Sequence, residues 1–442
     1  MRRFFSPSVA AVLAAGAPVV ACSGGDGASS LAMTAIQRAS STTIHGAAPM
    51  ALVTPGGDRV LSWVADDSAT GREALFVEVA RAGSAAVEPV SVVRDSLGGI
   101  EPHGEAPPRL AAAPDGALYA LYTVGKEVPG ERFPRSALRL VRSEDRGRTW
   151  SDPISVNEGS RFGSHNFHAL LAGPRGAVYA AWLSSTRGRS AVWLRRSTDG
   201  GRSWLSAQPI DTTEACPCCR TGLALSPDGT LYLSWRKVFT GEIRDVVVIR
   251  SSDSGATWDP PARPREDNWV IAACPHAGPS LAVDQTGVVH MAWWTGKSGE
   301  AGVYYARSTD GGRHFQPVPI ATGDRSAPAH VQVTAGAAGA VVAWDDGLSS
   351  TPRILMRASS DGSRFGPIHQ VSESGAASFP VLGIIGDSLL IAWSETTDAA
   401  HWHGVATKPD MKNPKATMPL PRVGQAQIFE RRAALAEVFR AQ

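Results

Sequence analysis

The stretch Gly229–Trp235, "GTLYLSW", has six relatives along the 442-residue chain, each a short apolar run that ends in an aromatic residue. The seven copies end at Trp63, Tyr122, Trp182, Trp235, Trp293, Trp344 and Trp393, so the period is 49 to 60 residues. A second apolar run precedes each copy and a third follows it, as in "DVVVIRS" at 245–251. A sharp turn then leads into a fourth run. Four strands in each period predict an all-β fold, a β-propeller of four-stranded blades with seven repeats.

A second motif marks the turn that follows the third run. Four complete copies begin with serine and end with an aromatic residue, and a fifth is one residue shorter: Ser143–Trp150, Ser197–Trp204 ("STDGGRSW"), Ser251–Trp258, Ser308–Phe315 and Ser359–Phe365. In such a turn the aspartate bonds the local backbone, glycine adopts positive φ, and the aromatic ring packs back between strands. Asp145, Asp199, Asp253 and Asp310 are therefore predicted to shape turns rather than to carry chemistry.

With the turn motif as an Asp box, the chain resembles the Asp-box, or BNR-repeat, β-propellers of the sialidase superfamily over residues 45–410. The resemblance implies the propeller fold, with the six blades of sialidases as the alternative to seven. Sialidases bind the sugar carboxylate with three arginines and attack with a tyrosine, and this pattern is not carried over. An Arg-Ile-Pro-type motif is lacking between His45 and Glu105, and the last tyrosine is Tyr305, which lies just before an Asp box. Whether the protein is an enzyme stays open at this point.

The N-terminus has the features of a bacterial secretory signal. Arg2 and Arg3 precede a short apolar run, and "VVAC" ends in Cys22, as in a lipobox. We expect lipidation of Cys22, a membrane contact through that anchor, and a location in the bacterial cell envelope; an ordinary signal peptidase site is the alternative. The predicted boundaries are a signal at 1–22, a flexible tether at 23–44, the propeller at 45–415, and an extension at 416–442.

The extension is predicted to contain a short helix, because Ile428, Leu435 and Phe439 have helical spacing. The chain has 43 Lys and Arg against 41 Asp and Glu. Because positive and negative side chains are nearly equal in number, no strongly basic surface is expected, and the composition excludes a nucleic acid partner.

Cysteine and histidine recur where the chain enters the innermost strand of a blade, which is the face on which propellers bind ligands. They lie 14 to 19 residues before the terminal aromatic residue in six of the seven repeats. The stretch "EACPCCRTG" at 214–222 alone contains three of the five cysteines. Thiolate and imidazole together suit copper or zinc, so this register predicts a transition-metal site. The candidate ligands are Cys216, Cys218, Cys219, Cys274, His276, His165, His168 and His330.

Other interpretations of the same residues remain open. Four cysteines beyond Cys22 in an exported protein also suit two disulfides, such as a clip from Cys216 or Cys218 to Cys274. A redox-active "CPC" pair is a third option.

A separate ligand site is predicted at Arg220, Arg244 and Asp245, because arginine binds a carboxylate or phosphate with two parallel hydrogen bonds. A small ligand or a glycan would suit it. Three functions follow: a propeller that binds a ligand or a metal, a glycoside hydrolase of exo-sialidase type, or a non-catalytic interaction scaffold with structural disulfides.

Overall fold

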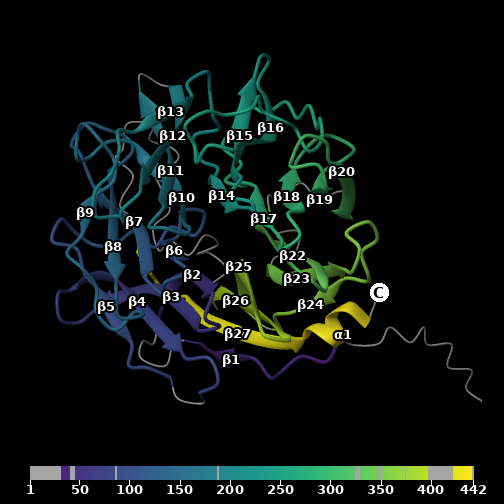
Figure 1. Cartoon of the computed structure of the whole chain (residues 1–442), viewed down its shortest axis with the longest axis horizontal. Helices are drawn as coiled ribbons and strands as arrows, with labels where there is room; N and C mark the ends of the chain where they lie inside the picture. Colours follow the sequence, from purple (N-terminus) through teal and green to yellow (C-terminus); the bar gives the residue numbers. More distant parts are fainter. Residues whose placement is uncertain are drawn as a thin grey trace, which may run out of the picture. The chain divides into compact units, whose positions relative to one another are not determined.

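The computed structural model describes residues 31–39, 45–84, 87–186, 189–323, 329–346, 351–373, 375–396 and 422–440. In this part of the chain, seven antiparallel sheets surround a common centre (Figure 1). Each sheet is one blade and contains one of the seven sequence repeats. The prediction of a seven-repeat propeller is confirmed, and the six-bladed alternative is wrong.

In the first six blades the strands run outward from the centre in chain order. The first three blades consist of β2 (Ala47–Val53), β3 (Arg59–Asp67), β4 (Arg72–Ala80) and β5 (Ser91–Val93); β6 (Arg109–Ala112), β7 (Leu118–Lys126), β8 (Arg135–Ser143) and β9 (Ile154–Ser155); and β10 (His165–Ala172), β11 (Val178–Thr186), β12 (Arg189–Ser197) and β13 (Gln208–Asp211). The fourth blade has three strands, β14 (Gly222–Leu225), β15 (Leu231–Phe239) and β16 (Ile243–Ser251), with an isolated bridge from Val248 to Ala262 at the fourth position.

The remaining blades return to four strands. They are β17 (Ser280–Val283), β18 (Val289–Thr295), β19 (Gly302–Ser308) and β20 (Gln316–Thr322); β21 (Val331–Gly336), β22 (Gly339–Asp346), β23 (Arg353–Ser359) and β24 (His369–Gln370); and β25 (Ala376–Ile385), β26 (Ser388–Thr396), β27 (Gln427–Ala434) and β1 (Gln37–Arg38). A single helix in this part of the chain, α1 (Leu435–Arg440), follows β27, and no described helix is long and apolar enough to cross a membrane.

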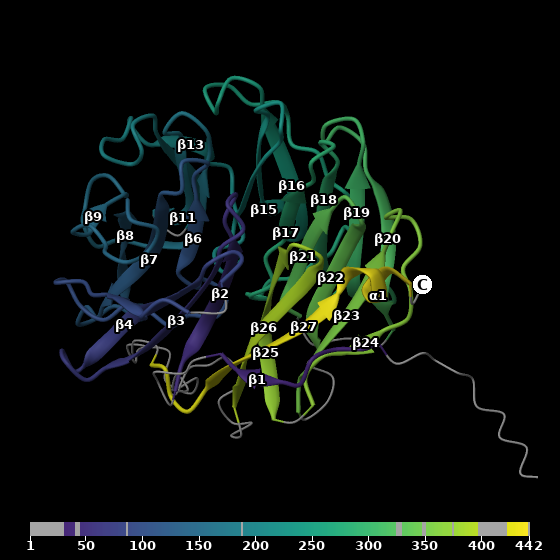
Figure 2. The ribbon, with the colours of Figure 1, turned by 60° about the horizontal axis from the view of Figure 1, so that its bottom comes forward.

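The last blade closes the ring with both ends of the described chain. β1 pairs antiparallel with β27, and Figures 1 and 2 show the purple β1 next to the yellow β27. Leu31, Met33 and Ile36 pack against the core of this blade. Part of the segment predicted as a tether at 23–44 is therefore a component of the propeller. The helix predicted from Ile428 onward is also wrong in extent, because the chain pairs with β26 until Ala434 and becomes helical only at Leu435.

The aromatic residue that ends each repeat lies in the second strand of its blade and packs between neighbouring sheets. Trp63, Trp235, Trp293, Trp344 and Trp393 are among the largest fully buried side chains. The innermost strands of neighbouring blades contact one another around the ring. Replacing a buried aromatic ring with alanine typically costs about 3–5 kcal/mol, so these residues are strong determinants of the blade packing.

The Asp boxes form the predicted turns. Asp199 accepts hydrogen bonds from the backbone nitrogen of Ser203 at 2.9 Å and from its hydroxyl at 2.5 Å, and Ser197 Oγ accepts the N–H of Gly201 at 2.9 Å. Gly200 and Gly201 have φ of 73° and 76°, a backbone region that favours glycine. The indole Nε1 of Trp204 donates to Gly201 O at 3.2 Å, which folds the ring back onto the turn.

These turns predict an acid-dependent loss of stability. Hydrogen bonds from the side chain and backbone of Ser203 lower the pKa of Asp199 below its usual value. A carboxylate with a lowered folded-state pKa stabilises the fold above its unfolded pKa, and this contribution is lost as the pH falls through the folded value. We expect the free energy of unfolding to decrease from pH 5 to pH 2, and less steeply in Asp199→Asn, because this side chain no longer takes up a proton on unfolding. Urea unfolding at each pH measures this, with Asp152→Asn, an exposed residue outside the boxes, as the control; equal slopes in Asp199→Asn and the wild type would contradict the prediction.

Candidate functional site

Three cysteine side chains meet on the loop between β13 and β14. Cys216 Sγ lies 3.2 Å from Cys219 Sγ and 3.8 Å from Cys218 Sγ. The three sulfur atoms all lie within 4.8 Å of one another, and the residues are buried, with Cys216 and Cys219 0% exposed. Such a group of thiols can surround one metal ion.

Backbone hydrogen bonds hold this loop against two blades. Cys216 N donates to Arg236 O of β15 at 2.8 Å, and Ala215 N donates to Ser190 O of β12 at 2.8 Å. Thr221 N donates to Phe167 O of β10 at 3.0 Å. The positions of the three sulfur atoms are therefore set by the third and fourth blades together.

Cys274 reaches the same cluster from the loop between β16 and β17. It is exposed, and a hydrogen bond with Cys218 lowers the pKa of its thiol. Arg244 anchors this loop through a 2.8 Å hydrogen bond to Ala273 O. His276 has a φ of 50° and its ring Nδ1 lies 3.2 Å from Cys274 O. If that nitrogen is the donor, the lone pair of the neutral imidazole is left on Nε2.

Two arginines give the cluster a positive surrounding. Arg244 Nη1 lies 3.6 Å from Cys216 Sγ. Arg236 is only 1% exposed, and all of its hydrogen bonds in the described part of the chain go to the backbone oxygens of Ala277, Arg244 and Trp294. A buried cation without a carboxylate partner is costly and favours an anion beside it.

Two of the four thiols, Cys216 and Cys274, have a lowered pKa, and the other two have a raised pKa. Hydrogen bonds from Cys218 and Cys219 lower the pKa of Cys216, and the charges of Arg236 and Arg244 lower it further. The pKa of Cys218 is raised by the same hydrogen-bond contacts, and burial raises that of Cys219. The arrangement thus favours one thiolate, at Cys216, that accepts hydrogen bonds from neighbouring thiols.

The other predicted metal ligands lie outside this group. His168 is fully buried and its Nε2 lies 3.0 Å from Leu121 O. The Nδ1 of His330 lies 2.6 Å from the Asp345 carboxylate. Burial lowers the pKa of His165, which lies beside Gly163 at the start of β10. Within the described ranges, the group of donor atoms that could share one ion consists of Cys216, Cys218 and Cys219, so it contains neither these three histidines nor Cys274 and His276.

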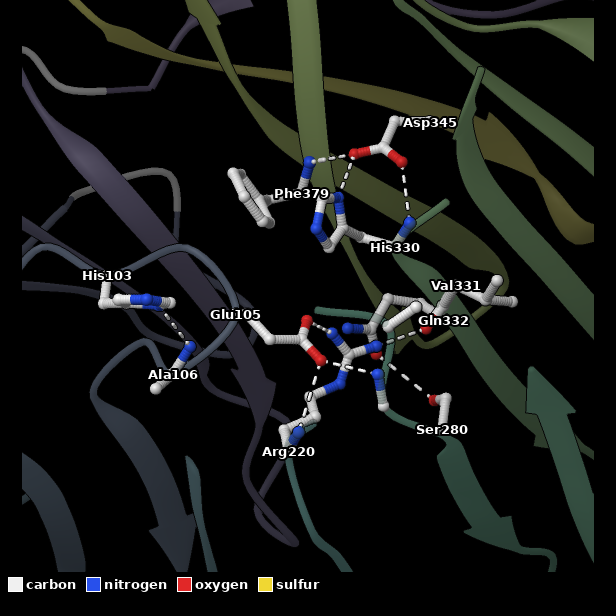
Figure 3. A network of polar contacts seen from close by, with 12 residues as sticks. His103, Glu105, Ala106, Arg220, Ser280, His330, Val331, Gln332, Asp345 and Phe379 are labelled. Atoms are coloured by element: carbon white, nitrogen blue, oxygen red, sulfur yellow. Dashed lines mark hydrogen bonds and ion pairs between the residues drawn. The ribbon is translucent and has the colours of Figure 1, made fainter. Parts of the chain in front are cut away.

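A second network crosses the centre of the ring (Figure 3). The Glu105 carboxylate accepts hydrogen bonds from Arg220 Nη1 at 2.6 Å and from Gly278 N at 2.6 Å. Arg220 Nη2 donates to Val331 O at 2.5 Å. Glu105 and Arg220 are 1% and 3% exposed. These contacts connect the second, fourth, fifth and sixth blades, and the sequence analysis gave no role to Glu105.

Asp345 extends the network toward the last blade. Its carboxylate accepts the backbone N–H of His330 at 2.7 Å and that of Phe379 at 3.0 Å. The negative charge of Asp345 and its hydrogen bond raise the pKa of His330 even though burial alone would lower it. The imidazole and the carboxylate therefore pair with each other. His330, which was predicted to be a metal ligand, instead has Asp345 as its partner.

The predicted ligand-binding residues have internal partners as well. The guanidinium of Arg220 donates hydrogen bonds to the Glu105 carboxylate and to Val331 O, so it already binds a carboxylate of the protein itself. Arg244 contacts Cys216 and pairs with Glu242 at 3.1 Å. Asp245 is fully buried and accepts hydrogen bonds from Arg263 at 3.0 Å and from Trp269 N at 3.2 Å. The three residues do not converge on a common free surface.

Three aromatic rings lie between the thiol cluster and the central network. The ring centroids of His103 and Phe167 are 5.5 Å apart, and that of His276 is 6.2 Å from His103. Phe167 has a φ of 54° and also packs against the buried cysteines. Left-handed backbone at a residue other than glycine is strained, and such residues cluster at functional sites.

Comparison with known proteins supports the fold. A family model described as a BNR repeat-like domain matches residues 87–274. Among solved structures, an ulvan lyase of a polysaccharide lyase family has a TM-score of 0.52 at 14% identity, covering 80% of this chain and 92% of that chain. An α-L-arabinanase from Penicillium chrysogenum has a TM-score of 0.49 at 14% identity and covers 89% of this chain and 95% of its own.

The Hadza microbial sialidase Hz136 has a TM-score of 0.45 at 17% identity, covering 84% of this chain and 75% of that chain. None of the curated proteins matches the chain in sequence. At 14% identity and a TM-score of 0.52, the similarity to the ulvan lyase concerns the fold alone.

Proposed function

We propose that this seven-bladed β-propeller, in which residues 87–274 match a model of the BNR repeat-like domain, binds one Cu(I) or Zn(II) ion through Cys216, Cys218 and Cys219, with Cys274 as a fourth donor. The observation that carries this proposal is the convergence of three buried cysteine sulfurs within 4.8 Å of one another, beside two arginines, with Cys274 of a second loop next to Cys218. Structural zinc sites use four such donors in a tetrahedral arrangement, and Cu(I) also prefers soft thiolates.

The charge of the surroundings supports a thiolate complex. Four thiolates around Zn(II), or three around Cu(I), leave a net charge of about two negative units. Arg236 and Arg244 can offset this charge in the buried site. When bound, the metal would crosslink the loops of the fourth and fifth blades, and the hydrogen bonds of Arg244 to Cys216 and Ala273 O would hold the two loops in register.

Sialidase-type hydrolysis receives no support from the tyrosines. All six tyrosines of the chain are buried, between 0% and 6% exposed. Tyr122 bonds Asp95 at 3.0 Å and Tyr305 bonds His290 at 2.7 Å, so both hydroxyls belong to the packing of their blades. We propose a binding function rather than a glycosidase. Cys22 lies outside the described residues, so its lipidation and the envelope location stay predictions.

An anaerobic titration of the reduced protein tests the metal site. We expect about one equivalent of Zn(II) or Cu(I) to bind, with only sulfur in the first coordination shell by X-ray absorption, since the converging donors are thiols. Bound metal should raise the unfolding temperature, because a ligand that binds only the folded state stabilises it. A thiol count on the protein as purified separates the disulfide interpretation: no free thiols, no bound metal and no metal-dependent change in stability would support a scaffold with disulfides and overturn the proposal.

A further inference from the structure

A cavity of about 770 Å³ opens beside the exposed cysteine of the cluster. Its lining includes Trp269, Val270, Ile271, Cys274, Pro275 and Trp294, and none of its lining residues is charged. Cavities that bind small organic ligands typically fall between about 300 and 1,000 Å³ and are mostly apolar. The volume lies in this range, and the lining combines two indole rings with uncharged polar groups, so the cavity suits a small molecule that has both an aromatic ring and polar atoms.

The wall of this cavity is rigid and contains an unused donor. Trp269 and Trp294 pack edge to face with ring centroids 5.1 Å apart. A Cβ atom at position 296 would lie 2.6 Å from the Trp294 ring, so Gly296 is needed for the two rings to pack as they do. Trp294 is 3% exposed, and its Nε1–H has no hydrogen-bond partner in the described part of the protein. A ligand with an acceptor atom that reached this group would remove the cost of the unmade hydrogen bond.

Contacts between sulfur atoms lead from the cavity to the buried site. Cys274 lines the cavity and is hydrogen-bonded to Cys218, and Cys218 Sγ lies 3.8 Å from Cys216 Sγ. Cys216 Sγ in turn lies 3.2 Å from Cys219 Sγ. The two sulfur–sulfur distances within the cluster are short enough for a metal ion to bind the next sulfur before it leaves the previous one.

We propose that this cavity accepts the metal as a complex with a small aromatic chelator, and that Cys274 is the first protein ligand to take the metal from it. The inference rests on the proposed function of the thiol cluster. One metal–nitrogen or metal–oxygen bond to the chelator breaks as the bond to Cys274 sulfur forms, and the thiol proton passes to the released donor atom or to water. The same exchange repeats at Cys218, and the oxidation state of the metal does not change.

Metal transfer from two chelators tests the cavity. The reduced full-length protein is mixed with zinc bound to pyridylazoresorcinol, a flat aromatic dye, or with zinc bound to nitrilotriacetate, a compact charged chelator. Val270 is 65% exposed, so Val270→Arg places a charge at the cavity while leaving the fold intact. We expect this variant to slow transfer from the dye by about tenfold, because the cavity becomes charged and partly filled, and to leave transfer from nitrilotriacetate unchanged.

Two further variants complete the design. Leu205→Arg changes another exposed apolar residue outside the cavity and should match the wild type with both chelators. Cys274→Ser should slow transfer from both, because the entry sulfur is missing. If the wild type binds zinc but Val270→Arg takes it from the dye at the wild-type rate, the cavity proposal is overturned and the metal site stands. If the wild type binds no zinc at equilibrium, the proposed function itself fails.

Discussion

Cys219→Ser is expected to weaken metal binding by about a hundredfold or more, because an incomplete ligand set remains around the ion. Cys219 is 0% exposed and its sulfur lies 3.2 Å from that of Cys216, so it is central to the cluster. Serine keeps nearly the same volume, which limits packing effects in the apoprotein. Competition with a chelator of known affinity measures the change, and the unfolding temperature of the metal-free variant checks that the fold is retained.

The stability of the metal-bound protein should change in parallel. Metal at 100 times its dissociation constant stabilises a folded protein by about 2.7 kcal/mol, and a variant with a hundredfold weaker site loses most of this at the same concentration. His314→Ala is the matched control: His314 is an exposed Asp-box residue whose ring bonds Asp310 at 2.6 Å, and its loss should leave metal affinity unchanged. Equal affinities for Cys219→Ser and the wild type would place the metal elsewhere or exclude it.

The architecture could be predicted from sequence because two independent repeats run in phase along the chain. Each aromatic terminus fixed a second strand, and each Asp box fixed a turn, so seven repeats predicted the seven blades that are observed. The C-terminal segment does not adopt the structure that its sequence pattern predicts. Ile428, Leu435 and Phe439 are spaced as in a helix, but the open edge of β26 offers backbone partners to residues 427–434, and pairing outweighs the local pattern.

The register of cysteine and histidine predicted which face they occupy but not their partners. Cys216, Cys218 and Cys219 do come together, with Cys274 next to Cys218, whereas His168 and His330, at similar register, are paired with Leu121 O and Asp345. The distinction depends on contacts between blades that are far apart in sequence. Periodicity within one blade carries no information about them.

A usable signal for the central network was nevertheless present in the sequence. The residue after the terminal aromatic is uncharged in five repeats and charged in two, at Arg236 and Asp345. Both are buried, at 1% and 4% exposed, and each contacts residues of other blades. A charge at a position that the repeat keeps buried predicts an internal partner, because an unpaired buried charge is too costly.

The central network also supports placing the proposed ligand site away from the axis. Glu105, Arg220, Asp345 and His330 use their polar atoms on one another or on backbone groups, so their charges are satisfied without a ligand. The four thiols, by contrast, have only one another and two arginines as partners for their charge. A ligand therefore gains more at the thiol cluster than at the axis.

Glu105→Ala is expected to destabilise the whole ring by about 3–5 kcal/mol, because it leaves Arg220 as an uncompensated charge in a buried position. Glu105 accepts hydrogen bonds from Arg220 and Gly278, and Arg220 continues to Val331, so one substitution affects contacts among four blades. Glu105→Gln keeps the shape of the side chain and an acceptor for Gly278 N, so it should lower the free energy of unfolding by less than Glu105→Ala does. Urea unfolding measures both variants.

Glu88→Gln is the control, since Glu88 pairs with Arg81 and Arg148 at a partly exposed site where solvent replaces the lost contacts, and we expect little change in the free energy of unfolding. If Glu105→Ala unfolded at the same urea concentration as the wild type, the central network would contribute nothing to closing the ring, and the buried aromatic residues between blades would have to account for its closure alone.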